Sequence, residues 1–459
     1  MTAAGAARTS KPVLRAVRSL LKFLLWGLLA IVVLAVVANS VLALWAGRKE
    51  KAVRARWAAG PGSLEAYQAA IPETQTNGTA KDLEAVASEL GIGSWGEQAR
   101  PAKKPWTEIS ESLTKYVWTE LADSGPATAP APPTVAAFLE SHQGAIAHVR
   151  HILIQDPPPI WEERRTRLLS MPTPNGATVL GLTKLLVADA LTSLGRRDTN
   201  TALSDGEVTW RLCDAFGRRP DFLSLITTFV CQRYWVGIVR KFEEPLPAWP
   251  VRLQSMSPRR ALVRAFQGEA CRMLEMSHLD YADLGIGDKA TFADRLSFEV
   301  GRPYARLSFA YTADTLLDEI QAAQAAGPCS ADLEPRLQQV IENIPRWNVI
   351  AQIALPNELE YWGRADKLQL DVELTRVILL AQRARTENRG IWPESLSGIE
   401  PSACSTGHWN YVRNNSGIAI AYSAAPAFPW LDAHPKGLRL PLKYEVPIVV
   451  PALHRDSNP

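Results

Sequence analysis

The chain has 459 residues, of which 47% are hydrophobic and 21% charged, and its formal net charge is +3. This length exceeds one typical domain. The near balance of charge argues against a nucleic-acid partner, because a surface that follows phosphates normally shows a strong basic excess. The five cysteines form no C-x-x-C pair, which excludes the common zinc and thiol-redox motifs.

The N-terminus combines a basic tail, residues 1–22, with an apolar run, residues 23–46, that contains no charged residue. Crossing a hydrocarbon core of ~30 Å requires about 20 such residues in a helix. Trp26 and Trp45 lie near the two ends of the run, where amphipathic rings favour the headgroup region. The sequence therefore predicts a transmembrane helix over residues 23–46, with the membrane as a partner.

Two other interpretations of this run remain open. A cleaved signal peptide would use Val41-Leu42-Ala43 as its small-residue site, but its apolar region is usually about 7–15 residues long. A buried core helix is the second alternative. The length of the run and its basic flanks favour a retained anchor.

Basic residues flank both ends of the predicted span, so orientation rests on a small difference. The tail before it has no acidic residue, whereas Glu50 lies among the basic residues from Arg48 to Arg56. The positive-inside rule then favours a cytoplasmic N-terminus. We expect a single-pass protein of the cell membrane with an extracytoplasmic body. The Arg48–Arg56 stretch would suit anionic headgroups.

Residues 47–124 are predicted to form a juxtamembrane stem, broken at Gly60-Pro61-Gly62, and short helices. One helix begins with Thr79 as N-cap and ends at Gly91, and a second covers Trp106 to Leu121. Residues 125–133 (GPATAPAPP) are predicted to be a linker, because proline fixes an extended path.

Residues 134–365 show helical periodicity without strand-like alternation. The first helix is capped by Thr134 and carries one apolar face as far as Leu153. The next helices are expected at roughly 176–194, 201–216, 221–242, 257–277, 288–300, 303–326 and 331–343. No 34-residue period recurs as it would in a tetratricopeptide array. We therefore expect an irregular helical bundle or a solenoid-like body.

Residues 366–459 combine a helix with strand-like runs, unlike the helical region before them. An amphipathic helix ends near Asn388-Arg389-Gly390, and two strand-like runs, Trp409–Val412 and Ile418–Tyr422, follow. The intervening Asn414-Asn415-Ser416-Gly417 predicts a β-hairpin, and residues 438–450 are expected to add a strand. The predicted fold class is mainly α, with a small C-terminal α+β element.

The segment ENRGIWPESLSGI followed by HWNYVRNNSGIAIAYS resembles the tail of type II secretion pseudopilins. This resemblance implies a helix, a turn and a small sheet, and a role as an accessory component of such a secretion system. The chain has no prepilin-peptidase site before Phe23. The anchor, the ELGI helix end, the GRRP turn and the WPESL tail together also resemble uncharacterised membrane-anchored helical proteins of bacteria, which implies no activity.

Candidate metal ligands are few. Glu275 and His278 have the Glu-x-x-His spacing of di-iron bundles, but such sites need two of these motifs. His148 and His151 share a helix with Glu140 and His142, without a second cluster elsewhere. No H-E-x-x-H, G-x-S-x-G or Walker A motif occurs, and Gly285-Ile-Gly287 lacks the context of a phosphate loop. We expect no metal and no cofactor, and no catalytic residue is identified.

The cysteines and tryptophans are expected to be structural. Cys213, Cys231 and Cys271 lie in apolar helical runs and are expected to be buried. Cys329 and Cys404 lie in loops and could form a disulfide if the body is exported. Most of the 15 tryptophans are expected in the core; several exposed together would mark a partner or glycan surface.

The leading hypothesis for function is a membrane-anchored helical protein of the bacterial envelope that binds or scaffolds another protein. One alternative is an anchored enzyme whose site is assembled from distant helices. The pseudopilin-like secretion component is the other. An apolar groove would favour binding, and a pocket gathering ionisable groups would favour catalysis.

Overall fold

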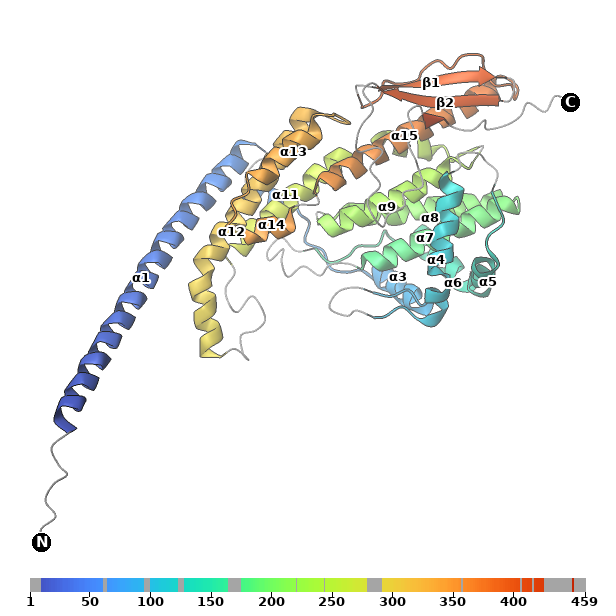
Figure 1. The fold of residues 1–459 in the computed structure, drawn as a ribbon. Helices are drawn as coiled ribbons and strands as arrows, with labels where there is room; N and C mark the ends of the chain where they lie inside the picture. The colour runs from blue at the N-terminus through green and yellow to red at the C-terminus, as the bar shows by residue number, and fades with distance from the viewer. Residues whose placement is uncertain are drawn as a thin grey trace, which may run out of the picture.

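The computed structural model describes residues 10–60, 64–94, 100–122, 128–163, 175–219, 221–242, 244–278, 291–355, 358–404, 407–414, 417–424 and 448–449, and it is mainly helical (Figure 1). The helices are α1 (Ser10–Ala59), α2 (Leu64–Ala69), α3 (Gly78–Glu89), α4 (Lys104–Ala122), α5 (Pro133–Ser141), α6 (Gln143–Gln155), α7 (Gly176–Gly195), α8 (Thr199–Gly217), α9 (Phe222–Val239), α10 (Ala248–Ser255), α11 (Pro258–Met276), α12 (Phe292–Ala326), α13 (Leu333–Glu342), α14 (Val349–Ala354) and α15 (Glu358–Glu387). The strands are β1 (Gly407–Asn414), β2 (Gly417–Ala424) and β3 (Ile448–Val449).

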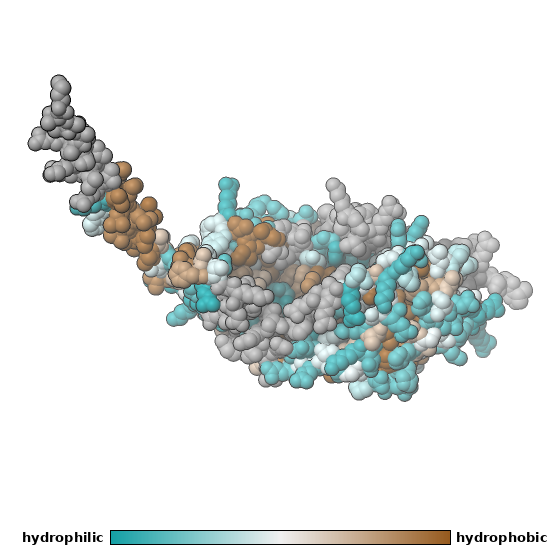
Figure 2. Space-filling view, turned by 90° about the horizontal axis from the view of Figure 1, so that it is seen from below, coloured by the Kyte–Doolittle hydropathy of each residue, from teal (hydrophilic) through white to brown (hydrophobic). Residues whose placement is uncertain are grey.

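Helix α1 contains the predicted apolar run and is long and apolar enough to cross a bilayer. Its apolar half stands clear of the body with its side chains exposed (Figures 1 and 2). Helices α7 and α9 also meet the length and composition of a membrane span. Most of their residues are buried inside the body, however, so their apolar character is also that of core helices.

The predicted stem is the second half of α1 and packs against α12. Val53 and Trp57 on this part of α1 are fully buried, and the Trp57 ring lies 5.8 Å from that of Tyr67 on α2. Lys49 pairs with Asp314, and Arg56 reaches the same carboxylate at 2.7 Å. The helix is continuous from the apolar run to Ala59, because no proline or glycine pair interrupts it before Gly60.

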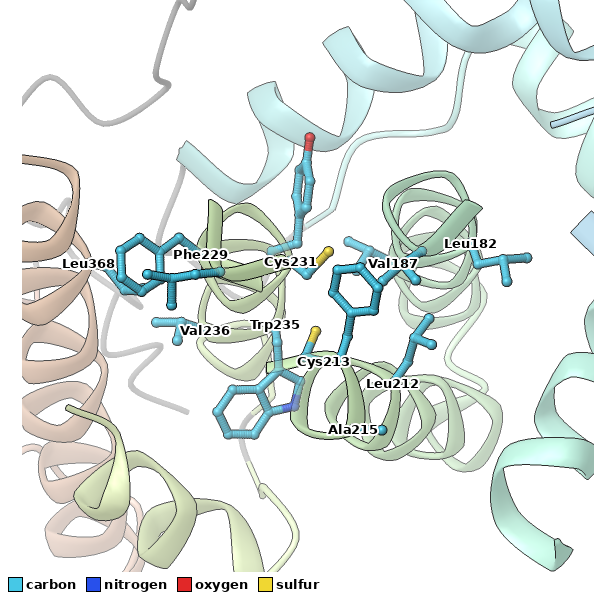
Figure 3. Packing of buried hydrophobic residues seen from close by; sticks show 14 of the residues in the cluster. Leu182, Val187, Leu212, Cys213, Ala215, Phe229, Cys231, Trp235, Val236 and Leu368 are labelled. Atoms are coloured by element: carbon cyan, nitrogen blue, oxygen red, sulfur yellow. The ribbon is translucent and has the colours of Figure 1, made fainter. Parts of the chain in front are cut away.

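The centre of the body is a three-helix core of α7, α8 and α9 (Figure 3). Each of these helices has an N-cap residue whose side chain accepts a hydrogen bond from a backbone N–H of the first turn. These N-cap residues are Asn175, Asp198 and Asp221 respectively. The thiols of Cys213 and Cys231 face the interior of this core, and Cys271 is buried on α11, as predicted. None of these three thiols is part of a disulfide.

Several predicted helix boundaries differ from the structure. Asn77 caps α3 in place of Thr79, because its side chain accepts the N–H of Ala80. The helix expected from Thr134 divides at His142, whose ring stacks on Phe138, and its first part has no side-chain cap. Helices 288–300 and 303–326 form one helix, α12, which contains Pro303 in its partly exposed half.

The C-terminal element follows the predicted order of helix and hairpin. Helix α15 packs against α9 and α11, and β1 pairs antiparallel with β2, with Trp409 opposite Tyr422. The alternating residues Ile418, Ile420 and Tyr422 are buried in a second core shared with α15. β3 pairs with β2, while the rest of the strand expected over 438–450 lies outside the described residues.

Candidate functional site

The candidate metal ligands are not brought together. His148 and His151 are exposed on α6. Glu275 accepts a hydrogen bond from Gln68, and the ring of His278 contacts Glu50 on α1, so this pair fastens α11 to the N-terminal helices. In the part of the chain that the structure describes, no three His, Cys, Asp or Glu residues are grouped as a metal site. Gly285 and Gly287 lie outside that part.

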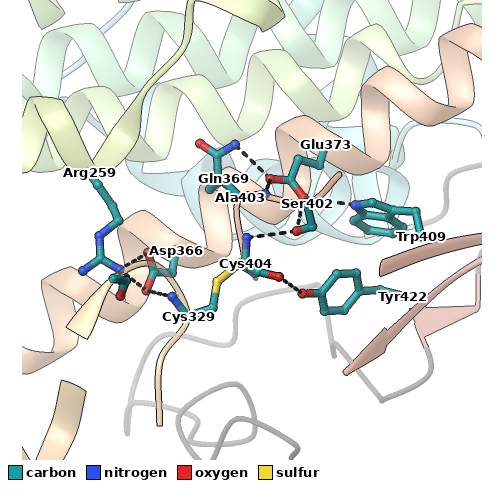
Figure 4. Close-up of a disulfide and its surroundings, with 11 residues drawn as sticks. Arg259, Cys329, Asp366, Gln369, Glu373, Ser402, Ala403, Cys404, Trp409 and Tyr422 are labelled. Carbon is teal, nitrogen blue, oxygen red and sulfur yellow. Dashed lines mark hydrogen bonds and ion pairs between the residues drawn. A yellow bond between two sulfur atoms is a disulfide. The ribbon is translucent and has the colours of Figure 1, made fainter. Parts of the chain in front are cut away.

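Cys329 and Cys404, the two loop cysteines that the sequence suggested could pair, form a disulfide with their Cα atoms 5.1 Å apart (Figure 4). The bond joins the turn after α12 to the coil before β1. The backbone N–H of Cys329 donates to Asp366 on α15, and the hydroxyl of Tyr422 donates to the carbonyl of Cys404. Helix, turn and hairpin are therefore fixed to one another at this end of the body.

Glu373 on α15 holds the coil that precedes the hairpin (Figure 4). Its carboxylate accepts hydrogen bonds from the Ser402 hydroxyl at 2.6 Å, the Ala403 N–H at 2.9 Å and the Trp409 indole N–H at 3.0 Å. Gln369 donates a fourth bond at 3.0 Å. A buried carboxylate needs such donors to offset its loss of water, and these bonds position the coil along one face of α15.

An open cleft lies between this coil, α10 and α15, with a volume of ≈ 220 Å³. Its lining is mainly apolar. The lining residues are Pro250, Gln254, Glu373, Arg376, Val377, Leu379, Leu380, Arg383, Gly398, Ile399, Glu400, Pro401 and Trp409. Gly398 has a φ of +83°, a left-handed conformation that glycine adopts without strain.

The charged groups of the cleft are already paired. Arg376 forms an ion pair with Glu400, and Arg383 bonds Glu387 on the next turn of α15 at 2.9 Å. The Glu373 carboxylate is occupied by the four donors described above. The cleft can therefore receive apolar side chains, with polar groups at its rim.

Groups with strongly shifted pKa values lie elsewhere in the body. Burial raises the pKa of Asp205 to about 7, against the opposing effect of Arg150, which donates at 2.6 Å. Burial likewise raises the pKa of Asp366 to about 6, against the effect of Arg259 at 3.0 Å. Both carboxyls are buried and paired, and neither lines the cleft.

The residues of the cleft were not singled out in the sequence. Glu373 falls within an ordinary amphipathic helix, and its role depends on Trp409 and on the coil 402–403, which are distant in sequence. The nearest signal was the WPESL tail, which places a helix before a hairpin but does not specify a cleft between them. Most described tryptophans are buried, as predicted, while Trp45 is 45% exposed.

Comparison with family models, curated proteins and solved structures found no match.

Proposed function

We propose that this chain is a single-pass, membrane-anchored protein of the bacterial envelope, and that its body binds another protein through the cleft between α10, α15 and the coil 398–401. The apolar lining of the cleft, with its charged groups already paired, is the observation that carries the proposal.

The size of the cleft supports a protein partner over a small-molecule substrate. Small-molecule sites commonly have ~300–1,000 Å³, and ≈ 220 Å³ accommodates one or two side chains of a partner. Protein interfaces are often dominated by a few apolar or aromatic residues inserted into such pockets. The partner is therefore expected to present an apolar anchor residue, flanked by polar groups that face the ion-paired rim of the cleft.

The disulfide supports an extracytoplasmic position of the body. Disulfides persist in oxidising compartments and are rare in the cytosol, where thiols are kept reduced. Cys329 and Cys404 are both fully buried, and their bond joins separate elements. The acid-free basic tail before α1 favours the same orientation.

Site-specific photo-crosslinking in intact cells tests the binding proposal. A photoreactive residue in place of Ile399, which lines the cleft, should give a discrete adduct with one protein. The same residue in place of Leu223, which is exposed on α9 away from the cleft, should not give that adduct. The variant Leu380→Glu should weaken the Ile399 adduct, because a carboxylate on the apolar lining must lose water when a partner binds.

Binding through the cleft would be wrong if position 399 gave no adduct, or if the adduct persisted unchanged in Leu380→Glu. Leu223→Glu serves as the matched control for the added charge. It should leave the Ile399 adduct at its original yield.

A further inference from the structure

The N-terminal part of α12, residues 292–302, carries an apolar stripe that nothing in the described structure covers. We call this segment the α12 arm. Phe292 is 81% exposed, and Leu296 and Val300 are each more than half exposed. Residues four apart share one face of a helix, so these three side chains form a line. The arm begins at a capping box between Thr291 and Asp294, which fixes its first turn.

Helix α14 adds a second exposed apolar face beside α12. Ile353 is 77% exposed, and Val349, one turn earlier, is more than half exposed. Asn348 caps α14 through the N–H of Ala351 and donates to the carbonyl of Ser308 on α12 at 3.2 Å. These bonds hold α14 against α12, so its exposed face belongs to the same end of the body as the arm.

A cluster of aromatic rings surrounds Trp45, which lies near the end of the apolar run of α1. The Trp347 ring lies 5.7 Å from Trp45, 6.3 Å from Tyr304 and 5.1 Å from Tyr311. The Lys49 ammonium lies 4.1 Å from the centre of the Tyr311 ring. Tryptophan and tyrosine favour the headgroup region of a bilayer. The end of the apolar run and this part of the body therefore share one depth relative to the membrane.

The pairing of α1 with α12 fixes the direction of the arm. Trp45 meets Tyr311, and Arg56 meets Asp318 at 2.6 Å, so the two helices run parallel. The part of α12 before Tyr311 therefore extends in the same direction as the apolar run of α1, toward the membrane. Val300 lies about 16 Å from Tyr311 along this helix. Figure 1 shows the arm pointing toward the N-terminal end of α1, and Figure 2 shows hydrophobic surface on the body next to α1.

We propose that the α12 arm and the exposed face of α14 form a second membrane contact, in which the arm enters the leaflet next to the body of the bilayer that α1 crosses. Continuity with the apolar half of α1 identifies the bilayer as the occupant. The contact would hold the body close to the membrane at a fixed tilt, because α1 and α12 are joined by ion pairs and buried side chains.

The charges of the arm indicate which lipids it requires. Asp294 and Glu299 balance Arg295 and Arg302 along the arm. Lys49 and Arg56, which lie in the basic stretch after the apolar run, are paired with Asp314. Binding is thus driven by apolar burial, and we expect it in bilayers of zwitterionic phosphatidylcholine without anionic lipid.

Fluorescence from labelled cysteines in the full chain, reconstituted in phosphatidylcholine vesicles, tests this contact. An environment-sensitive dye on Leu296→Cys or Ile353→Cys should emit at shorter wavelength and be quenched by lipids that carry a spin label on the acyl chain. Dye on Ser297→Cys, which is exposed and points about 100° away on the same helix, should show neither effect. Dye on Leu223→Cys controls for an exposed apolar position on α9.

Two outcomes would overturn the proposal. Emission at positions 296 and 353 that matches the two controls would mean that the stripe remains in water. A shift to shorter wavelength without quenching by the spin-labelled lipid, reversed when excess lipid separates the molecules, would assign the stripe to a second copy of this chain.

Discussion

Glu319 is a buried carboxyl group on α12 that receives no hydrogen bond from the described residues. Burial raises its pKa well above the ordinary value of 4.5, and Asp318 adds to this effect. Below pH 4.5 the carboxyl is neutral in the folded and unfolded chain alike. As the pH rises above 4.5, the unfolded chain releases this proton first, so the free energy of unfolding falls until the folded pKa is passed.

We expect Glu319→Met to raise the free energy of unfolding at neutral pH by ~1–3 kcal/mol, because it removes a buried group without a partner. It should also flatten the loss of stability above pH 4.5. Denaturant titration of the full chain in detergent at several pH values measures both effects. Asp318→Asn, at a partly exposed neighbour, should have a much smaller effect, and a destabilised Glu319→Met would show that the carboxylate is satisfied.

The Cys329–Cys404 disulfide closes a loop with a sequence separation of 75 residues. For a loop of this length, the restriction of the unfolded chain corresponds to about 4 kcal/mol. We expect the double variant Cys329→Ser/Cys404→Ser to lose stability on this scale, measured by denaturant unfolding. Reductant should lower the stability of the original protein to a similar level and leave the variant unchanged. An original protein that is insensitive to reductant would contradict the disulfide.

At the scale of elements, α1 is both a candidate membrane span and a part of the body. Val53 and Trp57 belong to the main core, whereas residues 19–38 of the same helix are exposed. We expect a fragment of residues 48–459 to be soluble, cooperatively folding and strongly helical. A fragment of residues 61–459 should be less stable by several kcal/mol, since removing one buried tryptophan side chain alone costs ~3–5 kcal/mol.

Circular dichroism and thermal unfolding of the two fragments measure this difference. In the longer fragment, Trp57→Ala should reproduce much of the loss, while Lys51→Ala, at an exposed position on the same helix, should not. Equal stability of the two fragments would mean that α1 does not contribute to the stability of the body. A longer fragment that stays wholly with membranes would show that other segments bind lipid strongly.

The elements differ in how well the sequence predicted them. The sequence predicts the hairpin because alternating apolar residues and the turn Asn414-Asn415-Ser416-Gly417 are local signals. It predicts α7, α8 and α9 because their apolar periodicity is long. Helix α12 was divided at Pro303, since the sequence does not reveal that the rest of the helix is held by α1 and α11. The cleft depends on contacts between Glu373 and residues about 30 positions away, which no local pattern specifies.

For the whole molecule, topology decides which partners can reach the cleft. The described structure places the cleft at the hairpin end of α15, while the aromatic cluster and the α12 arm lie at the end where α1 emerges (Figure 1). A body anchored through α1 would thus present the cleft away from the bilayer. On the extracytoplasmic side the cleft would meet other envelope proteins. On the cytoplasmic side it would meet cytosolic proteins instead.

We expect the body to be exported, because Arg8 to Lys22 contains no acidic residue and the apolar run is long enough to remain as an anchor. A reporter that is active only outside the cytoplasm, fused after Pro459, should therefore be active. Acid protonates thiols and stops disulfide exchange. When acid-quenched cells are denatured and returned to neutral pH with an alkylating agent, Cys329 and Cys404 should resist alkylation until a reductant is added, while Cys213 reacts at once. A silent reporter together with two reactive thiols at 329 and 404 would place the body in the cytosol, which keeps such thiols reduced.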